Sequence, residues 1–215
     1  MGHNHDHNCA HENETRSKIV VFITAITMVL EIFFGYWTNS MALLADGWHM
    51  ASHVFALGLS WLAYFIARKY ADSKKYTFDR KKLLSLSGFI NAIALLIVAV
   101  LISVESVSKL FNPLEIMFRE AMIVAVIGLF VNILSAYILH GGRKDDNNIR
   151  AAYFHVLADA LTSIGAIAAL TAGIIWNIQW LDRVIGLVGA LVITKWALSL
   201  IWSSGKDLVD FNVKT

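Results

Sequence analysis

The sequence is poor in charged residues, proline and cysteine. Only 16% of its 215 residues are Asp, Glu, Lys or Arg, whereas 57% are hydrophobic and the mean hydropathy is +0.60. A soluble core of this size cannot bury that much apolar surface, so most of the chain is expected to lie in lipid. The single proline, Pro113, leaves long helices uninterrupted. The single cysteine, Cys9, excludes an internal disulfide framework.

A strong charge of either sign is also missing. The formal net charge is only +2, and the cations fall in short loops, which argues against a nucleic-acid partner. The first eighteen residues are hydrophilic and lack the basic, apolar and small-residue order of a cleavable signal. The first hydrophobic stretch is therefore expected to remain as a membrane span.

Hydrophobic windows of about twenty residues, the length that crosses roughly 30 Å of hydrocarbon, predict six transmembrane helices. They run approximately over residues 19–37, 41–66, 84–108, 119–140, 149–175 and 181–203. Short links at Thr38-Asn39-Ser40, around Asn112-Pro113 and at Trp176-Asn177 join them in pairs. The predicted fold class is an all-α membrane protein, a six-helix transmembrane bundle over 19–203 with a His-rich tail at 1–18 and a short tail at 204–215.

The cations are distributed unequally between the two sides of this bundle. One side has only Lys109, Arg119 and Arg183. The other side has Arg16, Lys18, Arg68, Lys69, Lys74, Lys75, Arg80, Lys81, Lys82, Arg143, Lys144, Arg150, Lys206 and Lys214. The positive-inside rule therefore predicts that both termini are cytoplasmic. The stretch Lys74 to Lys82 is expected to contact lipid headgroups.

Two pairs of ionisable residues lie within the predicted spans. His49 and His53 form an HxxxH motif in the second span, and His155 and Asp159 form an HxxxD motif in the fifth. A spacing of four places both members on one helical face, about 6 Å apart along the axis. An ionisable group in hydrocarbon costs several kcal/mol unless it has a partner or water, so each is a functional candidate.

The depths of the two motifs match. Measured from the inner face, His49 and His53 lie about 18 and 12 Å deep, and His155 and Asp159 about 9 and 15 Å. Three imidazoles and one carboxylate can therefore form a tetrahedral site, which suits Zn²⁺, Co²⁺, Ni²⁺ or Cd²⁺ and suits Mg²⁺ or Ca²⁺ poorly. Because metal binds only neutral imidazole and ionised carboxylate, protons compete with metal. We therefore predict exchange of metal for protons.

Other polar groups are weaker candidates. Asp46, one turn from His49, is a possible auxiliary ligand, but it could equally cap a helix or hydrate the path. Glu31, Glu105 and Lys195 are expected to form buried pairs or line a cavity. The N-terminal tail has a metal-binding composition and, without regular structure, would capture or deliver ions; the alternative is a disordered tail with incidental histidines. Its candidate ligands are His3, His5, His7, Cys9 and His11.

The segments around both motifs resemble the cation diffusion facilitator family. The residues that carry the likeness are Ser40-Met-Ala-Leu-Leu-Ala-Asp46-Gly-Trp-His49-Met-Ala-Ser-His53 and Ala152-Tyr-Phe-His155-Val-Leu-Ala-Asp159-Ala-Leu-Thr-Ser163. HxxxH with a His-rich tail is similar to the family's dissimilar-metal branch, which is associated with cobalt, nickel, zinc and cadmium. The resemblance implies a homodimeric metal/proton antiporter that works by alternating access and exports metal across the bacterial inner membrane. Asn132 and Asp182 stand where the family tends to keep polar groups.

Three features depart from the family pattern. The Phe-Gly segment before the third span reads Phe78-Asp79, and an acidic residue expected near position 84 is Leu84. The family's usual cytoplasmic C-terminal domain, which binds metal and holds the dimer, is expected to be absent from this chain. The expected absence of that domain concerns dimerisation and regulation.

Two other functions compete with metal transport. A membrane electron carrier would use His155 with His49 or His53 as axial ligands to haem, but it leaves Asp159 and one histidine unexplained. A metal-sensing membrane scaffold would need an output domain, which the sequence does not offer. The preferred interpretation is a secondary active transporter, not an enzyme, with no prosthetic group.

Overall fold

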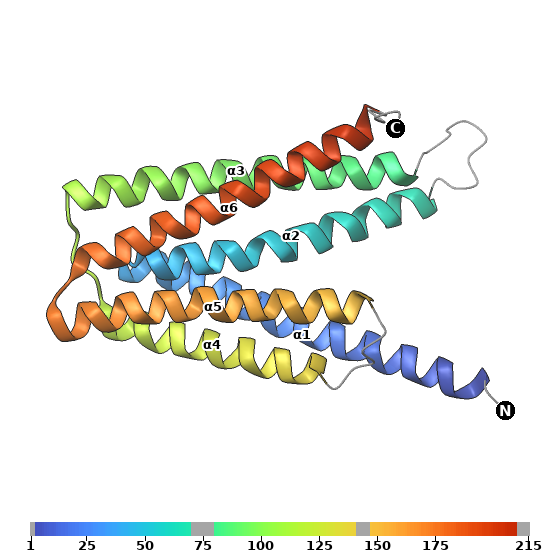
Figure 1. The fold of residues 1–215 in the computed structure, drawn as a ribbon, viewed down its shortest axis with the longest axis horizontal. Coiled ribbons are helices and arrows are strands. Elements are labelled where there is room, and N and C mark those ends of the chain that lie inside the picture. The colour runs from blue at the N-terminus through green and yellow to red at the C-terminus, as the bar shows by residue number, and fades with distance from the viewer. Residues whose placement is uncertain (1–2, 70–79, 141–146, 210–215) are drawn as a thin grey trace, which may run out of the picture.

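The computed structural model describes residues 3–69, 80–140 and 147–209, and these residues form six long helices (Figure 1). Their bounds are α1 His3–Thr38, α2 Met41–Lys69, α3 Arg80–Phe111, α4 Phe118–His140, α5 Asn147–Trp176 and α6 Gln179–Leu208. The helices occupy the ranges predicted from hydrophobic windows, and the all-α prediction is confirmed. The residues Phe78 and Asp79, and most of the stretch from Lys74 to Lys82, lie outside the described part.

Five of the helices are long and apolar enough to cross a membrane. Within the described residues these spans are Ile19–Thr38, Lys82–Phe111, Phe118–Ile138, Val156–Trp176 and Gln179–Leu208. Large apolar side chains such as Phe22, Phe130 and Trp202 are exposed on the outside of the bundle, as expected for a surface that faces lipid. The second predicted span lies in α2, a helix of 29 residues, many of whose side chains are outside the described set.

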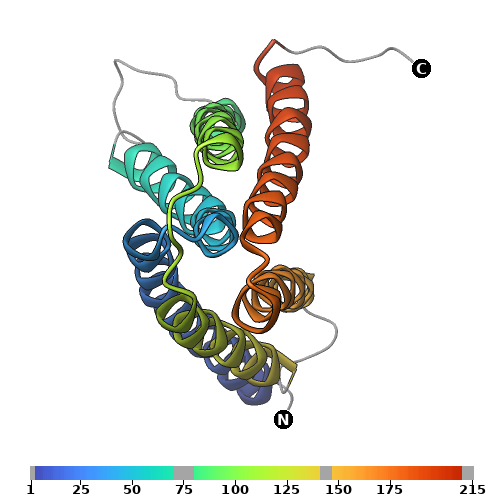
Figure 2. The same cartoon turned by 90° about the vertical axis from the view of Figure 1, so that its left-hand side faces the viewer.

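Helix α2 occupies a central position. It contacts α1, α3, α5 and α6, and the view from the end with the short links shows α1 and α4 on one side of it and α3 on the other (Figure 2). Its first part, from Met41 to Gly47, is buried throughout. The helix that carries the HxxxH motif is thus surrounded by protein rather than lipid at its N-terminal end.

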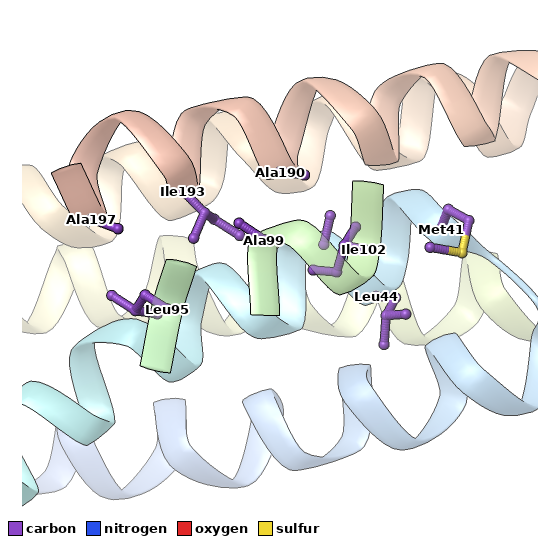
Figure 3. Packing of buried hydrophobic residues seen from close by; sticks show 9 residues of the cluster. Met41, Leu44, Leu95, Ala99, Ile102, Ala190, Ile193 and Ala197 are labelled. Atoms are coloured by element: carbon purple, nitrogen blue, oxygen red, sulfur yellow. The ribbon is translucent and has the colours of Figure 1, made fainter. Parts of the chain in front are cut away.

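Small residues allow α3 and α6 to pack closely against α2. Figure 3 shows side chains of this cluster between the three helices. Its buried members are Met41, Leu44, Ala45, Leu95, Ala99, Ile102, Ala190, Ile193 and Ala197. Lipid tails are as apolar as these side chains, so the gain on association comes from close van der Waals packing, which alanine at the contact permits.

The predicted short links between α1 and α2 and between α5 and α6 are confirmed. Asn39, between α1 and α2, has a φ of 59°, and Asn177, between α5 and α6, has a φ of 54°. This left-handed conformation is strained for most residues, but asparagine tolerates it because its short polar side chain can hydrogen-bond locally. Each asparagine therefore reverses the chain within one or two residues.

The N-terminal tail differs from its prediction. The backbone is helical from His3, so α1 continues without interruption through the tail into the first span. No glycine or proline occurs between His3 and Phe34 to end the helix, and each residue added to an existing helix needs only one further hydrogen bond. The side chains of the tail histidines lie outside the described residues.

Asp182 of α6 caps the N-terminus of α2. Its carboxylate accepts hydrogen bonds from the Ser40 hydroxyl at 2.6 Å and from the backbone N–H of Met41 at 2.7 Å. Ser40 in turn accepts one from the N–H of Leu43 at 3.2 Å. The first N–H groups of a helix have no partner within the helix, and a carboxylate also complements the helix dipole there. The side chain at position 182 therefore fixes the start of α2.

Removing this cap is expected to destabilise the bundle. Asp182→Ala leaves the buried Ser40 hydroxyl and Met41 N–H without their acceptor, at a cost of roughly 2–4 kcal/mol in the free energy of unfolding. Thermal unfolding in detergent measures the loss. Asp207→Ala is the matched control, because Asp207 is exposed at the end of α6. Equal stability of the Asp182→Ala and Asp207→Ala proteins would contradict the capping role.

Candidate metal site

The structure brings His49 of α2 next to Asp159 of α5. The imidazole Nε2 lies 3.3 Å from the carboxylate Oδ1, and the residues are only 3% and 1% exposed. The two helices run antiparallel (Figure 1), so the helical segment from His49 to His53 lies alongside the segment from His155 to Asp159. This pair supplies one nitrogen and one oxygen donor at a buried position between two helices.

Alanines on α5 make this approach possible. Ala166 and Ala169 are buried against Ala42 of α2, and Leu181 and Ile185 of α6 pack on the same cluster. Without larger side chains in the contact, α5 lies close enough for Asp159 to reach α2. Local sequence therefore sets both the ligand spacing on each helix and the distance between the helices.

The other two predicted ligands, His53 and His155, lie one turn from this pair. Both belong to regular helix, at residues 53 of α2 and 155 of α5. Their side chains are outside the part that the structure describes. Among the described side chains, no three His, Cys, Asp or Glu residues are grouped closely enough to hold a metal ion. The structure thus shows half of the predicted ligand set in contact.

The Trp196 ring of α6 lies beside the imidazole of His49. The two ring centroids are 5.0 Å apart, with an angle of 51° between the planes. A rigid aromatic ring at this distance restricts the rotamers open to the imidazole. Helix α6 therefore contributes to the orientation of a candidate ligand that belongs to α2.

Asp46 belongs to a chain of polar groups that crosses three helices. The Ser163 hydroxyl of α5 donates to Asp46 Oδ2 at 2.7 Å, and Asn132 Nδ2 of α4 donates to the Ser163 hydroxyl at 3.3 Å. All three side chains are buried. Sequence reasoning did not single out Ser163, although it lies four residues after Asp159 and thus on the same face of α5.

A cavity of about 230 Å³ extends from His49 and Asp46 between α2, α5 and α6. Its wall includes Thr162 and Gly165 of α5, which follow Asp159, and Ala42 and Ala45 of α2, which precede His49. Both sets lead to the end of the bundle at which the α1–α2 and α5–α6 links lie. The cavity therefore connects the candidate site with that end of the bundle.

The remaining ionisable residues of the spans have other surroundings. Glu105 pairs with Lys109 within α3 at 2.9 Å, which fits the predicted structural role, while Lys195 is exposed. Glu31 of α1 is fully buried against Gly128 of α4. Its carboxylate accepts no hydrogen bond from the described residues.

Comparison with known proteins identifies residues 17–209 as a cation efflux transmembrane domain. The zinc transporter ZitB of Escherichia coli is 36% identical over 217 residues, which cover 98% of this chain and 68% of the relative. A cadmium, cobalt and zinc/H⁺–K⁺ antiporter of Bacillus velezensis is 36% identical over 91% of this chain and 62% of the relative. The metal cation efflux system protein CzcD of Cupriavidus metallidurans is 34% identical, over 94% and 61%.

The chain thus spans about two thirds of the length of these relatives. Together with the apolar helices, the family match establishes an integral protein of the bacterial inner membrane. The relatives give no support to the alternative of a haem-binding electron carrier. They are transporters by name, which agrees with a secondary transporter rather than an enzyme.

Proposed function

This chain belongs to the cation diffusion facilitator family, and on that premise we propose that it exports divalent transition-metal cations in exchange for protons. The observation that carries the proposal is the buried contact between His49 and Asp159. These residues come from the two motifs whose spacing predicts a metal site, and the contact joins the two helices that bear them. A neutral imidazole and a carboxylate at this distance suit a borderline cation.

The proposed ligand set is His49, His53, His155 and Asp159. Helical spacing supports the two outer members, since each lies four residues from a member of the observed pair on the same face. Three nitrogens and one oxygen are compatible with Zn²⁺, Cd²⁺ and Co²⁺, which the names of the relatives mention. The same donors also accept Ni²⁺, which rests on ligand chemistry alone.

Proton exchange follows from the chemistry of these donors. A cation can bind only when the imidazoles are neutral and the carboxylate is ionised, so each binding event displaces protons. Protonation from the outer side would release the metal, and the site would lose those protons as it reloads from the cytoplasm. Alternating access then requires two arrangements of the bundle around one site.

The orientation in the membrane is part of the proposal. Six spans and cytoplasmic termini are supported by the start of α1 and the end of α6, which lie at the same end of the bundle (Figure 1). The helix ends on this side contain Arg68, Lys69, Arg80, Lys81, Lys82, Arg150 and Lys206, as the positive-inside rule requires of the cytoplasmic side. The cavity beside His49 would then face outward. The tail residues His3, His5, His7 and His11 would gather cations on the cytoplasmic side, where α1 begins.

A homodimer is also part of the proposal, and the resemblance to the family supports it. Mass photometry in detergent or nanodiscs measures the oligomeric state directly. We expect a mass of two copies of this chain, and a uniform monomer that transports metal would contradict this part of the proposal.

Flux in proteoliposomes tests the proposed exchange. With purified protein and an imposed pH gradient, Zn²⁺ should move in the direction opposite to the protons that flow down this gradient. The initial rate of Zn²⁺ flux should fall severalfold when an ionophore collapses the gradient. Liposomes without protein report leakage, and a potassium gradient imposed alone tests the second ion in the name of the Bacillus relative. A Zn²⁺ flux that does not change with the pH gradient would contradict proton exchange. The same assay is run with Cd²⁺, Co²⁺ and Ni²⁺, and an absence of flux for all four cations would contradict the transport function.

A further inference from the structure

We propose that Asp46 is a further cation-binding residue, which binds the cation transiently beside the main site, and that Ser163 and Asn132 position its carboxylate. The main site is the proposed ligand set of His49, His53, His155 and Asp159. This inference rests on the proposed transport function and adds three residues to it. The ligand would be the transported divalent cation as it passes between the pair His49–Asp159 and the cavity.

The hydrogen bonds fix the orientation of the carboxylate. Asn132 donates to the oxygen of Ser163, which leaves the serine proton to be donated to Asp46 Oδ2 at 2.7 Å. This is shorter than the alternative contact of the same hydroxyl with the Asp159 carbonyl, at 3.0 Å. A hydrogen bond to an ionised acceptor is also the stronger of the two. Ser163 therefore holds one oxygen of Asp46 in place.

The second oxygen of Asp46 remains available for a ligand. Oδ1 is buried and meets no donor at hydrogen-bonding geometry among the described residues, although the Thr162 hydroxyl lies close to the carboxylate. The hydroxyl of Thr162, on the same cavity wall, donates to the Asp159 carbonyl at 2.8 Å. A buried carboxylate oxygen without a partner is costly in a purely structural role, because burial removes its water without a replacement. A passing cation would supply that missing partner.

The position of Asp46 gives it a place in the path. It precedes His49 by three residues on α2, so it lies almost one turn nearer to the end toward which the cavity leads. Asp46 and His49 are the two ionisable residues of the cavity wall among the described residues. A cation that leaves the main site by this cavity would pass the carboxylate of Asp46.

The test separates transport rate from equilibrium binding. Initial Zn²⁺ flux in proteoliposomes and Zn²⁺ affinity by calorimetry are measured for the parent, Asp46→Asn, Asp46→Glu and Ser163→Ala, with thermal unfolding to verify the fold. Asp46→Asn should lower the maximal rate about tenfold while the affinity of the main site changes less than about threefold. Asp46→Glu keeps a carboxylate and should retain more rate than Asp46→Asn. Ser163→Ala should lower the rate about threefold.

Ser106→Ala is the matched control, because Ser106 is a fully buried serine of α3 outside this polar chain. It should transport at the parent rate. The inference is overturned if Asp46→Asn transports like the parent, or if it loses rate and affinity in the same proportion, as a main ligand would. Failure of the proposed function looks different, since the parent protein itself would then move no metal.

Discussion

Replacing Asp159 with alanine is expected to abolish cation transport, with an initial rate at least about 100-fold below that of the parent. The change removes the only anion of the proposed ligand set. It also removes the carboxylate that lies 3.3 Å from His49. Removing one partner of a buried charged pair typically costs about 3–5 kcal/mol, which corresponds to a factor of 100 or more. Three imidazoles alone would leave the charge of a divalent cation uncompensated in a low-dielectric interior.

Uptake of radioactive zinc into inside-out vesicles measures this loss. Asp207→Ala is the control for an aspartate that is exposed at the end of α6, and it should transport normally. His155→Ala should lose transport as severely as Asp159→Ala, because both remove one of four ligands. A folded Asp159→Ala protein that exports zinc at a rate near that of the parent would exclude this residue from the site.

Gly186→Ala is expected to have a large effect on assembly of the bundle. A methyl group on Gly186 would lie 2.6 Å from Met41 Cβ and 2.8 Å from the Met41 carbonyl oxygen. These atoms belong to the start of α2, which the carboxylate of Asp182 holds in place. Because backbone cannot move aside as a flexible side chain can, the clash would separate α6 from α2. The expected loss in the free energy of unfolding is about 3 kcal/mol.

Gly165→Ala is a matched control for this prediction. A methyl group at Gly165 of α5 would meet no atom within 4 Å, and alanine in a helix is more favourable than glycine by about 0.5–1 kcal/mol. Thermal unfolding in detergent should therefore rank Gly165→Ala at or above the parent and Gly186→Ala well below it. Equal stability of the two variants would show that α2 and α6 are not in close contact at Met41.

The sequence predicts the helices well because the bilayer sets their length. A window of about twenty apolar residues has few alternatives in lipid, where every backbone group must be paired within the segment. Because the bilayer fixes the length of each helix, the links at Asn39 and Asn177 could also be located from the sequence. Helical spacing places His53 on the face of His49 and His155 on the face of Asp159, and the structure describes the contact between His49 and Asp159 alone.

Contacts between helices were harder to predict. The capping of α2 by Asp182 joins residues more than 140 positions apart in the chain, and no local pattern encodes it. The polar chain from Asn132 through Ser163 to Asp46 depends on the rotation of three helices about their own axes. The sequence shows only that each of these residues is polar and lies within a span. This pattern marks a candidate functional residue but does not predict its partner.

The backbone of the N-terminal tail shows a further limit. Polar composition suggested a segment without regular structure, whereas α1 extends back to His3. Composition measures how little apolar surface a segment can bury, but it does not register that the segment is joined to a long helix. The metal-binding role of the tail histidines stays a prediction, as do those of His53 and His155.

X-ray absorption at the zinc edge tests most directly whether the two motifs enclose one cation. The sample is zinc-loaded protein in which His3, His5, His7, Cys9 and His11 are replaced by alanine, so that the tail contributes no ligand. We predict four nitrogen or oxygen neighbours at about 2.0–2.2 Å with imidazole scattering, and loss of that spectrum in Asp159→Ala. Six oxygen neighbours without imidazole, or a spectrum unchanged by Asp159→Ala, would contradict the site.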